Sequence, residues 1–190
     1  MKRKKFINLM TLGTGSLMVL PSISLLQSCQ YKPIVRLNIS EKDVPFLDEI
    51  AETIIPTTET SPGAKAAGVG AYMVVMYKDC MKAEDQITLV NGLNALDARA
   101  AETLGGSFIE AEATQKLQLL ETIQAEAHAF NQEQKGSEQP QRHYFDILRG
   151  LTTSGYFSSE IGMTQARRYN PVPGSYQGCI PFNPGDKVWA

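Results

Sequence analysis

The sequence predicts an all-α protein, a small irregular bundle of about five helices followed by an irregular C-terminal tail rich in proline and aromatic residues. Apolar residues recur at spacings of three and four over most of residues 40–160. Proline, glycine and polar clusters separate these runs, as at helix ends and loops. No stretch of useful length alternates between apolar and polar residues. With 190 residues, the chain has room for one domain with its own core.

Composition excludes a nucleic-acid partner. The chain is 43% hydrophobic and carries a formal net charge of -2. The N-terminal segment carries four basic residues and no acid, so that its loss would leave a net charge of -6. An acidic body has no electrostatic attraction to DNA or to anionic lipid.

Residues 1–28 have the layout of an export signal. A basic head, residues 1–5, precedes an apolar stretch that ends near Ser28. An uncleaved membrane anchor is the alternative, since the apolar stretch approaches the length that a bilayer requires. Glycines and Pro21 dilute the stretch and favour a cleaved signal.

Two short motifs refine this prediction. Leu26-Gln27-Ser28-Cys29 resembles a lipobox, so Cys29 is the predicted lipidation site, and an exported, lipid-anchored protein facing the periplasm is expected. A signal cleaved without lipidation remains an alternative. The segment from Arg3 to Asn8 resembles a twin-arginine export motif with Lys4 in place of the second arginine, which leaves the general secretory route open.

Residues 29–38 are short and polar, as expected of a tether, and residues 39–190 then form one helical domain. Ser40 is a suitable N-cap for the first helix, and Asp43 favours its N-terminal turn. Pro56 ends this helix, and residues 56–70 form a loop. The apolar face of the helix comprises Val44, Leu47, Ile50, Ala51, Ile54 and Ile55.

A second helix over residues 69–80 is apolar almost all round, which predicts a central, buried element. The third helix covers residues 83–104 and ends at Gly105-Gly106. Its expected apolar side comprises Ile87, Val90, Leu93, Leu96 and Ala100.

A fourth helix is expected to follow Ser107 and to reach Phe130, with Leu117, Leu120, Ile123 and Ala127 in register. After a polar loop over residues 131–141, residues 142–159 predict a final helix broken by Gly150 and Gly155. The tail, residues 164–190, has no helical or strand periodicity, and its exposed aromatic residues suit an interface.

The sequence contains no recognisable catalytic, cofactor-binding or metal-binding motif. Gly68-x-Gly70 lacks the third position and the preceding strand of a dinucleotide site, and there is no haem-attachment or cysteine-cluster motif. His128 and His143 are expected to face solvent or cap a helix. The stripe of tyrosine and methionine over residues 72–81 favours core packing over a ligand pocket. We therefore predict no catalytic residue, no cofactor and no metal in this chain.

Once Cys29 is assigned to lipid, Cys80 and Cys179 remain. Three alternatives stand: a bridge between the two, bridges to another chain, and two free thiols. An apolar setting for Cys80 would suit a free thiol.

The run FLDEIAETIIPTTETSPGAKAAGVGAYMVVMYKDC, which begins at Phe46, and DQITLVNGLNALDARA, which begins at Asp85, resemble the gluconate 2-dehydrogenase subunit 3 family. The family pattern E-x-I-I-P-x-T-x-T-P-G-A-x-x-x-G-V corresponds to Glu52–Val69, with Ser61 as one extra residue. The resemblance extends to GYF at residues 155–157 and to the YNPVPGSYQGC segment of the tail.

This resemblance implies a non-catalytic small subunit of a flavin-dependent sugar or polyol dehydrogenase. It implies FAD in a large partner subunit of the glucose-methanol-choline type, and in some complexes a haem c subunit as electron acceptor. The small subunit would act as export escort and, through Cys29, as membrane anchor. The residues expected at the partner interface are Pro56, Pro62, Tyr169, Pro171, Tyr176 and Trp189. The alternatives are a free-standing lipoprotein with a helical ligand pocket near residues 72–81 and, less favoured, an independent enzyme.

Overall fold

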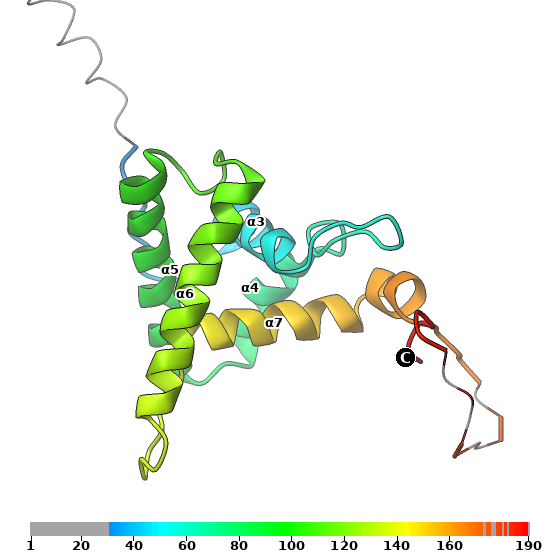
Figure 1. Ribbon diagram of the computed structural model, residues 1–190. Coiled ribbons are helices and arrows are strands. Elements are labelled where there is room, and N and C mark those ends of the chain that lie inside the picture. The colour runs from blue at the N-terminus through cyan, green and yellow to red at the C-terminus, as the bar shows by residue number, and fades with distance from the viewer. Residues whose placement is uncertain (1–30, 173, 176–177, 180, 182, 190) are drawn as a thin grey trace, which may run out of the picture. The chain divides into compact units, whose positions relative to one another are not determined.

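The computed structural model describes residues 31–189 except 173, 176–177, 180 and 182. The chain divides into two units, Met1–Lys32 and Pro33–Ala190, and the described helices lie in the second. Its described residues form five α-helices, α3 to α7, and two short helical turns, with one isolated β-bridge and no strand (Figure 1). The predicted all-α bundle of about five helices is confirmed. The export signal, Cys29 and Tyr176 lie outside the described residues.

Helix α3 (Val44–Ile54) follows a 3-10 turn, Glu41–Asp43, in the same direction. Ser40 is the N-cap of this turn, as predicted, and its backbone N–H and hydroxyl both donate to Asp43 Oδ2, at 3.0 and 3.2 Å. The helix ends directly before Ile55 and Pro56, as predicted. Proline at position 56 cannot continue the helix because it lacks the backbone donor.

Helix α7 (Tyr144–Ser158), and not α4 (Val69–Asp79), is the central element. It contacts each of the other four helices, whereas α4 leaves Val75 55% exposed. The prediction of a helix buried all round at residues 69–80 was therefore wrong. An apolar composition shows that a helix can be buried. The number of helices packed around it decides how much of its surface is buried.

Helix α5 (Ala83–Leu104) ends at Gly105, which has a φ of 72°, as the glycine pair predicted. Ile87, expected on the buried side, is 63% exposed, and burial begins at Leu89. The three- and four-residue spacing places these residues on one face of α5. Which part of that face is buried depends on how far the helix packed on it, α7, extends.

Helix α6 (Ala113–Glu133) begins later and ends later than predicted. Residues after Ser107 form a turn instead of a helix, because the Ser107 hydroxyl accepts from the Ile109 N–H at 3.2 Å. This turn brings Phe108 fully into the core, edge-on to Phe46 at 6.0 Å between ring centroids. Leu117, expected to be buried, is 47% exposed.

Helix α7 is continuous through both of its glycines, which corrects the predicted breaks. A Cβ at Gly155 would lie 2.6 Å from Tyr72 Cδ1, so this glycine permits close packing on α4. His143 caps the helix, with Nδ1 accepting from the Phe145 N–H at 3.2 Å, and His128 is exposed. Both histidines thus have the roles expected of them, and burial lowers the pKa of His143.

The bundle encloses one core to which all five helices contribute. Its fully buried large side chains are Leu47, Ile50, Val69, Met73, Leu89, Leu93, Leu96, Phe108, Ile123 and Leu148. Among the described residues, no buried side-chain nitrogen or oxygen lacks a hydrogen-bond partner.

Both ends of the helical unit are irregular. Residues 34–36 lie against α5, where Asn94 Oδ1 accepts from the Arg36 N–H at 2.8 Å and the Asn94 amide donates to the Arg36 carbonyl at 2.9 Å. The last part of the predicted tether is therefore fixed to the body. At the other end, a π-helical turn over Gly162–Ala166 occupies the beginning of the predicted irregular tail. No helix among the described residues is long and apolar enough to span a membrane.

Candidate partner-binding site

Glu52, at the end of α3, organises the loop that follows it. Its carboxylate accepts from the Thr57 N–H at 2.9 Å, from the Thr57 hydroxyl at 2.8 Å and from the Lys65 N–H at 2.9 Å. The Thr57 hydroxyl oxygen in turn accepts from the Gly63 N–H at 2.9 Å. One helical carboxylate thus holds both ends of residues 57–65.

Two glycines of this loop are required by close approach. A Cβ at Gly63 would lie 2.3 Å from both Glu52 carboxylate oxygens. A Cβ at Gly70 would lie 2.8 Å from the Val44 carbonyl oxygen, next to the Asp48 carboxylate that accepts the Gly70 N–H at 2.8 Å. Larger residues at either position would break the hydrogen bonds that shape the loop.

Tyr156 of α7 fixes the loop from the opposite side. Its hydroxyl donates to the Pro62 carbonyl at 2.7 Å and contacts Ser61 Oγ at 2.5 Å, across 94 residues of sequence in the first case. The Tyr156 side chain is 3% exposed. The Glu52–Val69 run and the GYF sequence at 155–157, which the sequence analysis treated as separate motifs, therefore meet at one place.

An ion-pair group supports the base of the loop. Lys116 of α6 donates to Glu49 Oε2 at 2.7 Å and to the Ile109 carbonyl at 2.8 Å, and Lys65 of the loop also pairs with Glu49. Burial is the largest single influence on Glu49 and acts to raise its pKa. The hydrogen bonds from Lys116 and Lys65 together outweigh it, so the pKa of Glu49 lies below its ordinary value. For the neighbouring Asp48, burial prevails over the hydrogen bond from Gly70 and raises the pKa.

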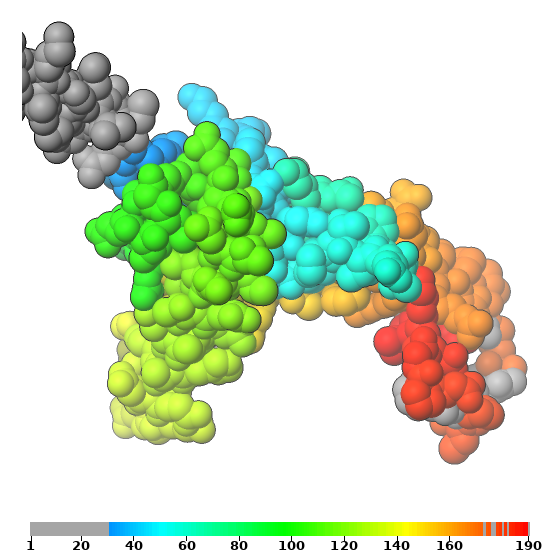
Figure 2. All heavy atoms as spheres, turned by 45° about the horizontal axis from the view of Figure 1, so that its top comes forward, coloured from blue at the N-terminus to red at the C-terminus, as the bar shows by residue number. Residues whose placement is uncertain are grey.

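An open groove of about 500 Å³ lies beside this loop. Figure 2 shows the loop, in cyan, next to the red C-terminal segment on one face of the molecule. Loop, α7 and tail all contribute side chains, and the lining residues are Ile55, Pro56, Thr58, Thr60, Ser61, Tyr156, Phe157, Ala166, Arg167, Val188 and Trp189.

Two arginine side chains stack on aromatic rings at the side of the groove formed by the tail. The Arg168 guanidinium lies 4.7 Å from the Trp189 ring, and Arg167 lies 4.3 Å from the Phe157 ring. The Arg168 N–H also donates to the Val188 carbonyl at 2.8 Å, which returns the end of the tail to the bundle. Trp189 remains 49% exposed and Val188 73% exposed, so the groove presents apolar surface to solvent.

The predicted interface residues divide into three groups. Pro56 and Trp189 line the groove together. Pro62 is half-buried, with its carbonyl bound by Tyr156, so it supports the loop from within. Tyr169 and Pro171 are exposed outside the groove.

Sequence reasoning missed Glu52, Tyr156 and Arg167 as individual contributors to this site. Glu52 and Tyr156 each lie within a motif that was recognised, but their partners are far away in the sequence or in a loop without periodicity. No sequence signal pointed to Arg167.

Cys80 and Cys179 are both exposed and free in the structure. The expected apolar setting of Cys80 was wrong, because α4 ends just before this residue and Lys78, Asp79 and Cys80 are all exposed. A bridge between the two cysteines is not formed here, while pairing with another chain stays a prediction.

A second open groove of about 530 Å³ separates the end of α4 from α7. Tyr72, Met76, Cys80 and Met81 contribute to it, so part of the tyrosine and methionine stripe faces a groove as well as the core. Within the described part of the chain, no group of three histidine, cysteine or acidic side chains is placed to hold a metal ion.

The family model described as gluconate 2-dehydrogenase subunit 3 matches residues 41–174. This range contains the first helix, the Glu52-bound loop and the whole helical bundle. No curated protein and no solved structure matches the chain.

Proposed function

The chain belongs to the gluconate 2-dehydrogenase subunit 3 family, and from that premise we propose that it is the non-catalytic small subunit of an exported FAD-dependent dehydrogenase. Family membership makes the chain a subunit of a larger dehydrogenase complex. We further propose that the large subunit, of the glucose-methanol-choline type, carries the FAD and oxidises a CH–OH group of gluconate or another sugar. A cytochrome c subunit would accept the electrons.

The convergence of the loop and the tail on one groove is the observation that supports this proposal most. The loop, two arginines stacked on aromatic rings and a half-exposed tryptophan surround a groove lined by both apolar and polar side chains. Partner-binding surfaces have this composition, and tryptophan is enriched among the residues that dominate binding energy. We propose that the large subunit docks here.

The N-terminal sequence supports the second part of the proposal, export and attachment. Residues 1–28 read as a signal, and Cys29 follows a lipobox-like segment. A flavoprotein that binds its cofactor before export must travel folded, which favours the twin-arginine route for the pair. Lipidation of Cys29 would then hold the complex on a membrane, facing the periplasm.

Co-expression with the large subunit tests the proposal. An affinity tag on this chain should copurify a flavin-containing partner, and deletion of this chain should leave the partner in the cytoplasm. Trp189→Ala should lower the recovery of the partner about tenfold, as loss of a central aromatic anchor does. Ile87→Ala is the matched control, because Ile87 is 63% exposed but does not line the groove.

A large subunit that is exported and active without this chain would exclude the escort role. Wild-type recovery of the partner by the Trp189 variant would exclude the groove as the docking site while leaving the family assignment intact.

The groove between α4 and α7 favours one alternative, a lipoprotein that binds a small ligand near Tyr72. Purified monomer whose melting temperature rises with an added sugar, and no longer rises in Tyr72→Ala, would support it. A melting temperature unaffected by sugars would remove it.

A further inference from the structure

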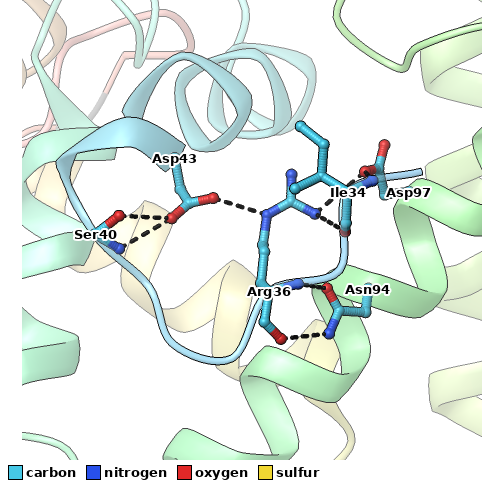
Figure 3. A network of polar contacts seen from close by, with 6 residues as sticks. All are labelled: Ile34, Arg36, Ser40, Asp43, Asn94 and Asp97. Atoms are coloured by element: carbon cyan, nitrogen blue, oxygen red, sulfur yellow. Dashed lines mark hydrogen bonds and ion pairs between the residues drawn. The ribbon is translucent and has the colours of Figure 1, made fainter. Parts of the chain in front are cut away.

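Arg36 fastens the start of the folded unit to its core. Its guanidinium donates to Asp43 Oδ1 at 2.8 Å, to Asp97 Oδ2 at 3.2 Å and to the Ile34 carbonyl at 3.2 Å (Figure 3). It also lies 4.3 Å from the centroid of the Phe46 ring. The side chain is 4% exposed and that of Asp97 is 1% exposed. Asp97 also accepts the Ile34 N–H at 3.0 Å. We call this set of contacts the Arg36 clasp.

Stability alone does not explain why a charged pair is buried at this place. A buried ion pair is seldom worth more than well-packed apolar residues, because both charges lose their hydration. Its specific effect here is geometric: Asn94 and Asp97 on α5 fix the backbone at Ile34 and Arg36, before Ile39, the first hydrophobic core residue in the described part of the chain.

The clasp limits the distance between the body and Cys29. An extended chain covers roughly 3.5 Å per residue, so the five steps from Cys29 to Ile34 reach about 17 Å. Without the clasp the first fixed residue would be Ile39, and the reach would be about 35 Å. If Cys29 carries lipid, as the proposed function holds, its lipid chains lie in the bilayer. Ile34 then lies no more than about 17 Å from the lipidated residue at the membrane surface.

The side chains beside the clasp are apolar and exposed. Ile34 is 58% exposed, Val35 is 81% exposed and Leu37 is 91% exposed. Three exposed aliphatic side chains in four consecutive residues form an unusual surface on a soluble unit. An apolar surface that a covalent lipid holds near a bilayer is placed to enter the headgroup region, where amphipathic segments bury apolar side chains by about 5–10 Å.

We propose that Ile34, Val35 and Leu37 form a membrane contact, and that the Arg36 clasp keeps this surface of the folded unit against the lipid. The inference rests on the proposed lipidation of Cys29. The occupant is a bilayer surface, recognised through apolar contact and not through anionic headgroups, since the body is acidic and offers no basic attraction.

The test uses the full lipidated chain in phosphatidylcholine vesicles that contain a lipid with a nitroxide near its headgroup. Leu37→Cys is made in a background of Cys80→Ser and Cys179→Ser, and the thiol is labelled with an environment-sensitive fluorophore. Ser137→Cys, at an exposed position in the loop after α6, is the matched control. The label at position 37 should lose about half of its emission to the nitroxide, and the label at position 137 should lose little.

A second variant tests the short distance to Cys29 that the clasp sets. Twelve Gly-Ser residues inserted between Lys32 and Pro33 lengthen the chain between Cys29 and the body and leave the Arg36 contacts intact. Quenching at position 37 should fall at least to half of its former extent, because three side chains alone bind a bilayer weakly. Unchanged quenching would show that this short distance does not set the contact and would overturn the role given to the clasp.

The two proposals fail in different ways. Mass analysis of the N-terminal peptide reports whether Cys29 is lipidated. A lipidated, vesicle-bound protein with equal quenching at positions 37 and 137 would overturn the membrane contact and leave the anchor in place. A blue-shifted, unquenched label at position 37 would show that protein covers this surface and would likewise overturn the inference. An unlipidated Cys29 would overturn both proposals.

Discussion

The loop over residues 56–70 and the tail after residue 166 are both irregular, and both contribute to the same groove, but they are held in different ways. Side chains of the helical bundle fix the loop: Glu52, Asp48 and Tyr156 bind six of its backbone and side-chain groups directly. The tail is held mainly through its own ends, by the Arg168–Val188 hydrogen bond and the Arg168–Trp189 stack.

This difference shows what makes an irregular segment rigid. The polar groups of Glu52, Asp48 and Tyr156 lose little additional conformational entropy when the loop binds them, because the helices already fix their positions. Exposed contacts within the tail must order both partners at once. We therefore expect substitutions at the loop to change the stability of the whole domain and substitutions in the tail to change binding alone.

The strongest test of the loop is Gly63→Ala. The added methyl group would lie 2.3 Å from both Glu52 carboxylate oxygens and expel the carboxylate from the loop, so we expect the free energy of unfolding to fall by about 3 kcal/mol. Urea unfolding measures this. Gly150→Ala is the control, because nothing lies within 4 Å of its Cβ position and alanine should stabilise α7 by about 1 kcal/mol. Equal effects of the two substitutions would contradict the crowded geometry at Gly63.

Glu52→Gln retains the shape of the side chain but replaces an acceptor with a donor. One of the two N–H groups at Thr57 and Lys65 would face an NH2 group, and we expect a loss of about 2 kcal/mol in the free energy of unfolding. Glu59→Gln, at the exposed part of the same loop, should change it by less than about 0.5 kcal/mol. A Glu52 variant as stable as wild type would mean that the carboxylate does not organise the loop.

Tyr156→Phe and Tyr169→Phe compare loop and tail through the same chemical change. Removal of the Tyr156 hydroxyl takes away the donor that ties the half-buried Pro62 carbonyl to α7 and leaves only the Ser61 hydroxyl, at 3.1 Å, so we expect a loss of about 1.5 kcal/mol. Tyr169 is 49% exposed, and loss of its hydroxyl should have no measurable effect on unfolding. A matched loss in both variants would show that the tail is as firmly integrated as the loop.

The smallest effect is the pH dependence of the ion pairs below the loop. Glu49 has a lowered pKa in the folded state, so its contribution is complete above its ordinary pKa of 4.5 and is lost as the pH falls below that value. We expect Glu49→Gln to cost about 1 kcal/mol at pH 7, since the group is partly solvated, and progressively less as the pH falls below 4.5. Burial raises the pKa of Asp48 and the charge of Glu49 adds to the rise, so the titration of Asp48 shifts downward in the Glu49 variant and contributes to the measured difference. A cost independent of pH would exclude the charge of Glu49 as its cause.

The fold followed from the sequence where short-range rules apply. Ser40 and Asp43 marked the start of the first helix and Gly105 the end of the third, because caps depend on neighbours within one turn. The same rules failed after Ser107, where the need to bury Phe108 outweighs an otherwise good N-cap. They failed again at Gly150 and Gly155, because packing on four helices compensates for the low helix propensity of glycine.

The candidate site was only half predictable. The sequence pointed to the Pro56–Gly70 loop and the aromatic tail as surfaces, but not to their meeting beside Tyr156. That meeting joins residues separated by more than 90 positions, and no periodic pattern carries such a distance.

The sequence by itself determined the all-α class, the positions of most helix ends and the membership of the family, since each depends on local spacing or on a contiguous motif. Only the tertiary structure decided that α7 is central, that one carboxylate shapes the Glu52 loop, and that Arg36 fixes the start of the domain on α5. These features depend on which distant groups share a buried environment, because the strength of a hydrogen bond or an ion pair is set by what excludes water from it.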